Sequence, residues 1–352
     1  MALLLKDGKI LKIIDRTLTE IDYDKDSIRE RDILSFCNML KGMGVAFFEI
    51  NSKVIKKVQS LPEGIDFIYR LESEYDAEEC IRRGIKFCAV KWVKLLNPYF
   101  CNILKRGNLN ITAEFKADCM SDLYRLRRLL ELNKIKDADN VRIVGLDRIV
   151  SDSWVGFTRN IRRNYEVNID ICPLNSFNIA TSLAVEAVMG GLEIVTLSFT
   201  GYGKKAGFAA LEEVLMAIKL MTGTEKGIEL DALPELSRIF SDMTGIRIRG
   251  NKAVIGSDIF KYESGIHADG IEKAPATYEP FNPYEVGQER KLIIGKHSGR
   301  RSVLRKLKEL GQDFDEAEIP SVLNKVRTKS IELKRELYDQ EIKDILVTNK
   351  AV

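Results

Sequence analysis

Residues 166–199 read EVNIDICPLNSFNIATSLAVEAVMGGLEIVTLSF and hold one complete strand–helix–strand pattern. Two runs rich in β-branched residues, 166–172 and 193–199, flank the helical pattern at 178–191. Runs of this composition and length are typical of buried strands. Two strands joined by a helix predict a parallel pair, because the chain must cross back over the sheet before the second strand begins.

The same pattern repeats along the first 220 residues. Six further apolar runs precede this unit, separated by helical patterns: 10–15 (ILKIID), 45–50 (VAFFEI), 67–73 (FIYRLES), 86–92 (KFCAVKW), 110–115 (NITAEF) and 141–146 (VRIVGL). Eight strands alternating with helices match the count and the length of a (β/α)8 barrel. An open Rossmann-type sheet is the alternative, but no Gly-rich dinucleotide turn follows a strand. We therefore predict an α/β fold, a (β/α)8 TIM barrel.

The spacing of apolar residues predicts one helix of the barrel wall, and the pattern after it predicts how the remaining chain is organised. Leu211, Val214, Leu215 and Ile218 recur at i, i+3, i+4 and i+7, which predicts an apolar stripe facing the barrel. Residues 231–246 are typical of one more helix, a loop-rich stretch follows, and the pattern is helical again from Ser302. We expect three segments: a barrel core at 1–224, a barrel-closing helix and linker subdomain at 225–300, and C-terminal helices at 301–352.

Composition restricts the class of protein and its partners. The 352 residues carry a net charge of only +3 and contain no dense Lys/Arg block, so neither nucleic acid nor an anionic membrane is an expected partner. The first 15 residues, MALLLKDGKILKIID, are too charged for a signal peptide or a membrane span. Six scattered cysteines without a C-x-x-C pair predict reduced, mostly buried thiols. We therefore expect a cytoplasmic protein.

Both histidines of the chain, His267 and His297, fall within residues 263–299. A lone histidine is more often a structural residue than a catalytic one, although its side chain titrates near neutrality. Here the segment holds three longer motifs: ESGIHADGI with His267, TYEPF followed by VG, and IIGKHSGR with His297. Together the motifs resemble the linker subdomain of the acetyl-CoA-dependent homocitrate synthase and isopropylmalate synthase family. The nitrogen-fixation type of homocitrate synthase is the most similar, and the lack of a leucine-binding domain after the helices favours it.

The resemblance implies an activity and assigns roles. It implies an acyltransferase that condenses acetyl-CoA with a 2-oxo acid, here 2-oxoglutarate, and hydrolyses the thioester to give homocitrate. His267 is the expected acid–base group at the acetyl methyl or at the new alkoxide, and Tyr278 would orient it or donate a hydrogen bond. His297 and Ser298, at an expected helix start, are either structural or part of the substrate site for coenzyme A.

The first strand departs from the family pattern at its carboxyl end. The family reads D-T-T-L-R-D/E, where the arginine polarises the keto group and the carboxylate binds a divalent cation. This chain reads DRTLTE at 15–20, so Glu20 keeps the acid and Thr19 replaces the arginine. Arg16 lies three residues from position 19. In an extended strand it would therefore point to the opposite face and could not substitute.

The remaining metal-ligand positions are also changed. The family's H-x-H-N-D after strand 7 aligns with Cys172 and Leu174, and the Asn of its G-I-G-E-R-A-G-N aligns with Phe208. Magnesium and manganese need several oxygen or imidazole ligands, which leucine and phenylalanine lack. We therefore expect this chain to bind no metal, with Glu20 as a residual ligand position.

Two further acids match motifs of the family, Glu114 more loosely than Glu49. Glu49 matches its I-E-V-G motif and Glu114 its A-E-D motif, so both are candidate substrate-binding residues. A salt-bridged carboxylate at the barrel mouth is the alternative for each.

The linker motifs are kept while the barrel motifs are changed, and this contrast suggests a division of labour. In the family the linker caps the active site of the neighbouring subunit, so its residues act in trans. The resemblance therefore implies one subunit of a heteromeric homocitrate synthase, with Mg or Mn held by a second, homocitrate synthase-like subunit. Two alternatives stay open. One is a non-catalytic scaffold or regulatory subunit. The other is a stand-alone enzyme of the isopropylmalate or citramalate synthase type, or an aldolase, with a metal-free site.

Overall fold

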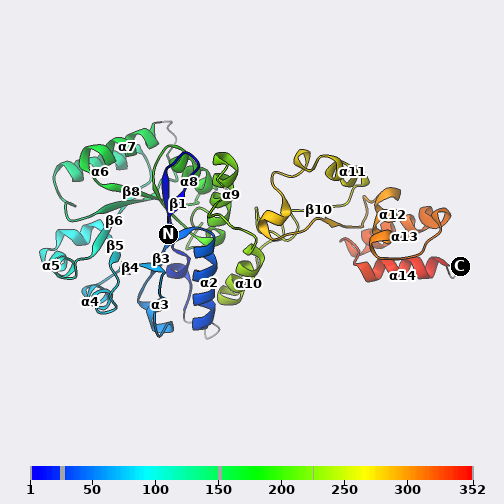
Figure 1. Cartoon of the computed structure of the whole chain (residues 1–352), viewed down its shortest axis with the longest axis horizontal. Coiled ribbons are helices and arrows are strands. Elements are labelled where there is room, and N and C mark those ends of the chain that lie inside the picture. Colours follow the sequence, from blue (N-terminus) through cyan, green and yellow to red (C-terminus); the bar gives the residue numbers. More distant parts are fainter. Residues whose placement is uncertain (1, 24–27, 150–152, 225, 351–352) are drawn as a thin grey trace. The chain divides into compact units, whose positions relative to one another are not determined.

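The structure is a computed structural model that describes residues 2–23, 28–149, 153–224 and 226–350. It divides into two compact units, Met1–Arg247 and Ile248–Val352, each described here by itself (Figure 1). The expected segment boundary after residue 224 precedes helix α10 (Leu233–Thr244), which the structure includes in the first unit.

The first unit is a closed parallel barrel. Within the described part of the chain, eight strands follow one another in chain order around the sheet, and the first and last of them pair to close it. Ile13 pairs with Val195 across this closure. The strands are β2 (Ile10–Asp15), β3 (Val45–Ile50), β4 (Asp66–Leu71), β5 (Phe87–Lys91), β6 (Asn110–Ala117), β7 (Asn140–Gly145), β8 (Asn168–Pro173) and β9 (Ile194–Leu197). All eight predicted strands and the predicted TIM barrel are confirmed.

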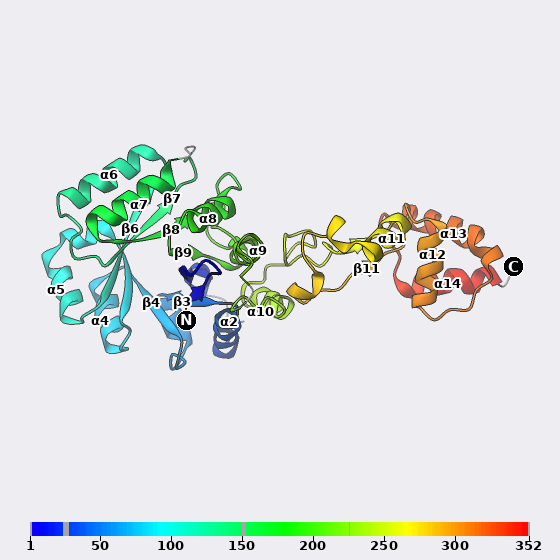
Figure 2. The same cartoon turned by 45° about the horizontal axis from the view of Figure 1, so that its top comes forward.

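Helices connect the strands and lie outside them (Figure 2). Asn51, Ser73 and Asn97 begin helices α3, α4 and α5 because their side chains accept hydrogen bonds from the first free backbone amides. The predicted apolar stripe on α9 is fully buried. The helices are α1 (Thr17–Glu20), α2 (Glu30–Gly42), α3 (Ser52–Lys57), α4 (Glu74–Arg82), α5 (Pro98–Arg106), α6 (Met120–Glu131), α7 (Trp154–Tyr165), α8 (Ala180–Met189), α9 (Leu211–Thr222) and α10, with 3-10 turns η1 (Trp92–Leu96) and η2 (Phe199–Gly201).

A short hairpin precedes the barrel. Strand β1 (Leu3–Leu4) pairs antiparallel with the start of β2, after a turn in which Gly8 has a φ of 82°. Leu3 and Leu5 are buried while Leu4 is exposed. The charged start of the chain, which the sequence left unassigned, therefore covers the amino-terminal end of the barrel.

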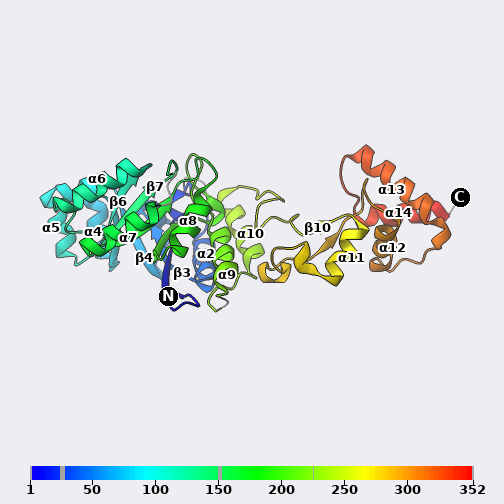
Figure 3. The same cartoon turned by 90° about the horizontal axis from the view of Figure 1, so that it is seen from above.

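The second unit, as far as residue 350, joins a two-stranded sheet to four helices. Strand β10 (Lys261–Tyr262) pairs parallel with β11 (Lys291–Leu292). The helices are α11 (Gly265–Lys273), α12 (Arg300–Glu309), α13 (Ile319–Leu333) and α14 (Asp339–Lys350), with 3-10 turns η3 (Pro275–Thr277), η4 (Pro283–Val286) and η5 (Glu316–Glu318). Figure 3 shows α12, α13 and α14 close to one another, and buried side chains that include Val303, Leu307, Val322 and Ile342 form one small core.

Residues 319–350, within the segment predicted to be helical, contain the two helices α13 and α14. Lys334 ends α13 in the left-handed conformation, with φ of 54°. Arg335 then binds Glu341 through two contacts of 2.8 and 2.9 Å, which places the start of α14. In the described ranges, no helix is long and apolar enough to cross a membrane.

Helix α9 allows a matched test of barrel packing. Leu215 is fully buried and Leu220, on the same helix, is 49% exposed. Leu215→Ala is expected to lower the free energy of unfolding by about 3 kcal/mol, because it removes buried methyl groups and leaves a cavity. Leu220→Ala should change it by less than about 0.5 kcal/mol. Denaturant unfolding followed by circular dichroism measures both; equal losses would contradict this placement of the helix.

Candidate functional site

The carboxyl end of β2 turns sharply at Asp15. One carboxylate oxygen of Asp15 accepts a hydrogen bond from the Thr17 amide (3.1 Å) and the other from the Thr17 hydroxyl (2.7 Å). The Thr17 hydroxyl in turn accepts from the Phe199 amide at 2.7 Å, just past β9. These bonds end the strand and start the single helical turn α1.

This turn directs Arg16 into the barrel mouth. Arg16 and Glu20 lie one helical turn apart, and Arg16 Nη2 contacts Glu20 Oε1 at 3.0 Å. The expectation that Arg16 points to the opposite face is therefore wrong. It assumed that the strand continues to position 19, whereas the chain ceases to be extended at Arg16.

Arg16 contacts the side chains that occupy the expected metal-ligand positions. Its Nη1 donates to Cys172 Sγ at 3.2 Å, and its guanidinium carbon lies 4.2 Å from the centre of the Phe208 ring. Leu174 is adjacent, because it forms an isolated antiparallel bridge with Phe208. Glu20, Cys172 and Phe208, which are distant in sequence, thus surround one guanidinium group.

The side chains at these positions do not fit a divalent cation. Glu20 is already paired with Arg16, and burial raises the pKa of the Cys172 thiol to about 11, so the thiol is protonated at neutral pH. Leu174 and Phe208 offer no ligand atom. Among the residues that the structure describes, no group of three or more His, Cys, Asp or Glu side chains is placed to hold a metal ion.

A second layer of charge lies deeper in the barrel. Arg142 on β7 is fully buried, and its Nε contacts Asp170 Oδ2 at 2.5 Å while its Nη1 contacts Glu49. Arg70 on β4 contacts Glu114 Oε2 at 2.7 Å. The two candidate substrate-binding acids are therefore engaged in ion pairs inside the barrel, as the alternative interpretation expects.

Arginines hold Glu49 in its charged form. Burial alone would raise the pKa of this carboxyl group, but the guanidinium groups of Arg142, Arg16 and Arg70 outweigh burial and lower the pKa to about 2. Sequence reasoning missed Arg70 and Arg142. The signal available was a charged residue inside an otherwise apolar strand, in FIYRLES and in VRIVGL.

In the second unit, Glu263 joins the linker motifs. Its carboxylate accepts from the His297 amide at 2.7 Å and from the Ser298 hydroxyl at 3.4 Å, and its carbonyl accepts from Ser302 Oγ at 2.9 Å. Ser298 is fully buried, and its hydroxyl also accepts from the Gly295 amide. The position of Ser298 is structural, while the His297 side chain is exposed on the turn before α12.

The structure brings His267 and Tyr278 together. Their ring centres lie 5.4 Å apart with 53° between the planes. Gly270 makes this possible, since a Cβ atom there would lie only 2.4 Å from the Tyr278 ring. Both rings are accessible: His267 is exposed and Tyr278 is 44% exposed. Both side chains can therefore contact a molecule that reaches this surface.

Glu279 and Arg290 fix the loop that carries Tyr278. Arg290 donates to both carboxylate oxygens of Glu279, at 2.8 and 2.7 Å. A bidentate pair of this kind restrains both residues in orientation as well as distance. The TYEPF motif therefore holds its tyrosine through the glutamate beside it.

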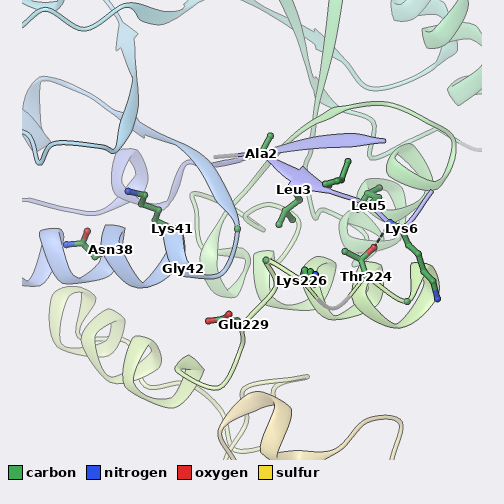
Figure 4. A pocket seen from close by; sticks show the side chains of 14 residues that line it. Ala2, Leu3, Leu5, Lys6, Asn38, Lys41, Gly42, Thr224, Lys226 and Glu229 are labelled. Atoms are coloured by element: carbon green, nitrogen blue, oxygen red, sulfur yellow. Dashed lines mark hydrogen bonds between the residues drawn. The ribbon is translucent and has the colours of Figure 1, made fainter. Parts of the chain in front are cut away.

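A hollow of about 1110 Å³ lies at the other end of the barrel (Figure 4). Leu3, Lys41 and Lys226 line it, together with Thr224, whose hydroxyl accepts from the Lys6 amide at 3.0 Å. It adjoins β1 and the start of β3, so it faces the amino ends of the strands. Reacting groups in this fold sit at the carboxyl ends, so the hollow is not the candidate active site.

Comparisons with known proteins agree with the linker motifs. A family model described as "Homocitrate synthase post-HMGL domain-like" matches residues 254–335. The chain is 34% identical over 345 residues to the homocitrate synthase omega subunit of Clostridium pasteurianum, covering 96% of this chain and 95% of that protein. It is 38% identical over 319 residues to 2-isopropylmalate synthase 2 of Caldanaerobacter subterraneus subsp. tengcongensis, covering 88% and 82%.

Solved structures agree with the barrel. The HMG-CoA lyase of Bacillus subtilis matches with a TM-score of 0.52 and 15% identity, covering 68% of this chain and 95% of the lyase. At this identity the match concerns the fold alone.

The side chains at the expected metal-ligand positions lead to a prediction about metal content. Purified chain should carry far less than one Mg or Mn ion per molecule, because Leu174 and Phe208 supply no ligand and Glu20 is already paired. Elemental analysis after gel filtration measures this. About one tightly held divalent ion per chain would contradict it.

From the raised pKa of Asp15 we expect the free energy of unfolding to depend on pH. Burial raises the pKa of this carboxyl group from 3.8 to about 7. The folded state therefore binds a proton that the unfolded state releases, so the stability from this group is fully present below about pH 4 and is lost as the pH rises through 7. Between pH 5 and 8 the free energy of unfolding of the wild type should fall by roughly 2–3 kcal/mol more than that of Asp15→Asn. Parallel stability profiles for the two proteins would refute this.

Proposed function

The chain belongs to the homocitrate synthase and isopropylmalate synthase family, and we propose that it is one subunit of a heteromeric homocitrate synthase. The observation that carries the proposal is the contrast between its two chemical centres. Arg16 fills the barrel mouth among Glu20, Cys172 and Phe208, while His267 and Tyr278 lie exposed and in contact in the second unit. In this proposal the linker pair serves the barrel of a second, metal-bearing subunit.

The proposed reaction is a Claisen-type condensation. A C–H bond of the acetyl methyl group loses its proton, the resulting carbanion forms a C–C bond with the keto carbon of 2-oxoglutarate, and the alkoxide takes up a proton. Water then cleaves the thioester, which releases coenzyme A and homocitrate. A divalent ion in the partner would polarise the keto group.

His267 would move a proton at the acetyl methyl or at the alkoxide, because its imidazole is accessible and an imidazole can both accept and donate a proton. Tyr278 would set the orientation of His267 through the ring contact or donate a hydrogen bond to the same oxygen. Gly270 and the Glu279–Arg290 pair fix where the tyrosine lies. His297 would approach the coenzyme A portion from the turn before α12.

The name of one relative supports the subunit role. The name of another indicates that the 2-oxo acid substrate has to be measured. The Clostridium pasteurianum protein is named as an omega subunit of homocitrate synthase, and the similarity extends over nearly the whole of both chains. The relative from Caldanaerobacter subterraneus subsp. tengcongensis is named as an isopropylmalate synthase. Activity should therefore be assayed with a panel of 2-oxo acids, with 2-oxoglutarate as the expected substrate.

The test uses this chain co-expressed with a metal-competent homocitrate synthase subunit. His267→Ala should lower turnover by about two to four orders of magnitude, the usual contribution of a positioned acid or base. Tyr278→Phe should cost less, because the ring remains and one hydrogen bond is lost. Coenzyme A release at saturating substrate measures both, with gel filtration to show that assembly is unchanged.

Two further variants serve as controls. Gly270→Ala keeps both functional side chains but displaces the Tyr278 ring, so it should reproduce part of the loss. Glu20→Gln lies in this chain's own barrel and should leave turnover nearly unchanged. An inactive Glu20→Gln beside a fully active His267→Ala would place the working site in this barrel and overturn the proposal.

The scaffold alternative is separated by the same experiment. The ion pairs of Arg16 and Arg142 in the barrel are equally compatible with a chain that only binds its partner. A scaffold predicts that His267→Ala leaves both assembly and turnover intact.

A further inference from the structure

Arg16 is a buried cation at a point where three strand ends meet. Its side chain is only 5% exposed. It lies 3.0 Å from Glu20 Oε1 on the turn after β2 and 3.8 Å from Glu49 Oε1 on β3, and its Nη1 lies 3.2 Å from Cys172 Sγ on β8. The Phe208 ring covers one face of the guanidinium group.

The buried carboxylates and the buried guanidinium groups stabilise one another. Two carboxylates close together in a low-dielectric interior repel and are costly to desolvate unless a cation lies between them. Arg70 and Arg142 already pair with Glu49 and with the acids deeper in the barrel. Glu20 pairs with Arg16, so Arg16 supplies positive charge for the outermost acid of this network.

We propose that the Arg16 guanidinium group is a built-in replacement for the divalent cation of metal-dependent relatives. It is a fixed internal cation that neutralises Glu20 and Glu49 and ties together the carboxyl ends of β2, β3 and β8. The proposal concerns this barrel alone, so it does not depend on the proposed role of the linker.

The side chains around Arg16 suit a guanidinium group better than a metal ion. A planar guanidinium presents its hydrogen-bond donors at its edge and a weakly hydrated face. Its edge donates to Glu20 and Cys172, and its central carbon lies over the aromatic ring of Phe208, which attracts cations through its π electrons. The presence of Cys172 and Phe208 at two metal-ligand positions therefore has one common explanation. Together with Arg16 they form a single site whose cation is a guanidinium group.

A cycle of variants of the full-length chain tests the neutralising role, with thermal unfolding as the readout. Arg16→Ala should lower the unfolding midpoint by about 10 °C, because it leaves buried carboxylates unpaired. In a Glu20→Gln background the same change should cost less than half as much, because the outer negative charge is already absent. The matched control is Arg82→Ala, which removes an exposed arginine paired with Glu79 and should shift the midpoint by about 1 °C or less.

A second measurement asks whether the vacated space accepts a cation. Methylguanidinium at about 10 mM, compared with NaCl at equal ionic strength, should raise the midpoint of Arg16→Ala by several degrees. It should not raise that of wild type or of Arg16→Met, whose side chain fills the same space. If Arg16→Ala does not fold, Arg16→Met, which removes the charge but fills the space, takes its place in the cycle. Its loss should also shrink in the Glu20→Gln background.

Three results would overturn the proposal. One is a loss for Arg16→Ala no larger than that for Arg82→Ala. Another is an equal loss in the wild-type and Glu20→Gln backgrounds, which would mean that Arg16 acts through packing alone. The third is no specific response of Arg16→Ala to methylguanidinium, which would mean that the space does not select a cation.

Discussion

The ion pair between Arg16 and Glu20 decides what the barrel of this chain can do. A divalent cation needs free space at a point where several donor atoms converge, and here the guanidinium group of Arg16 lies among Glu20, Cys172 and Phe208. The pair exists because Asp15 binds Thr17 and ends β2, which turns Arg16 inward instead of letting it alternate along a strand. The barrel closes through parallel strand pairing and balances its inner acids with arginines.

The two units place their polar groups in opposite ways. In the barrel, Glu49, Arg142 and Asp170 are buried and paired with one another, so they are not accessible to a small molecule without rearrangement. In the second unit, Gly270 allows His267 and Tyr278 to meet on an accessible surface. We propose that these two side chains form an acid–base pair, and a pair without an available barrel in its own chain needs a partner that supplies the rest of the site.

The barrel could be predicted from sequence because each strand is a short β-branched run and each α/β unit repeats the same local pattern. The Arg16 site could not, because it depends on where β2 ends, and strand periodicity applies only while the chain stays extended. Arg70 and Arg142 were missed for a related reason: their partners lie on other strands. The linker motifs located His267 and Tyr278, but the ring contact follows from Gly270, whose close approach to Tyr278 is a tertiary feature.

The most direct test of this account is turnover by the purified chain alone, compared with the same chain mixed with a metal-bearing homocitrate synthase subunit. Release of coenzyme A from acetyl-CoA and 2-oxoglutarate is the quantity to measure, across increasing ratios of the two subunits. The account predicts no turnover above background for the chain alone, and activity that rises and saturates as the complex forms. Turnover by the chain alone that the second subunit leaves unchanged would contradict it.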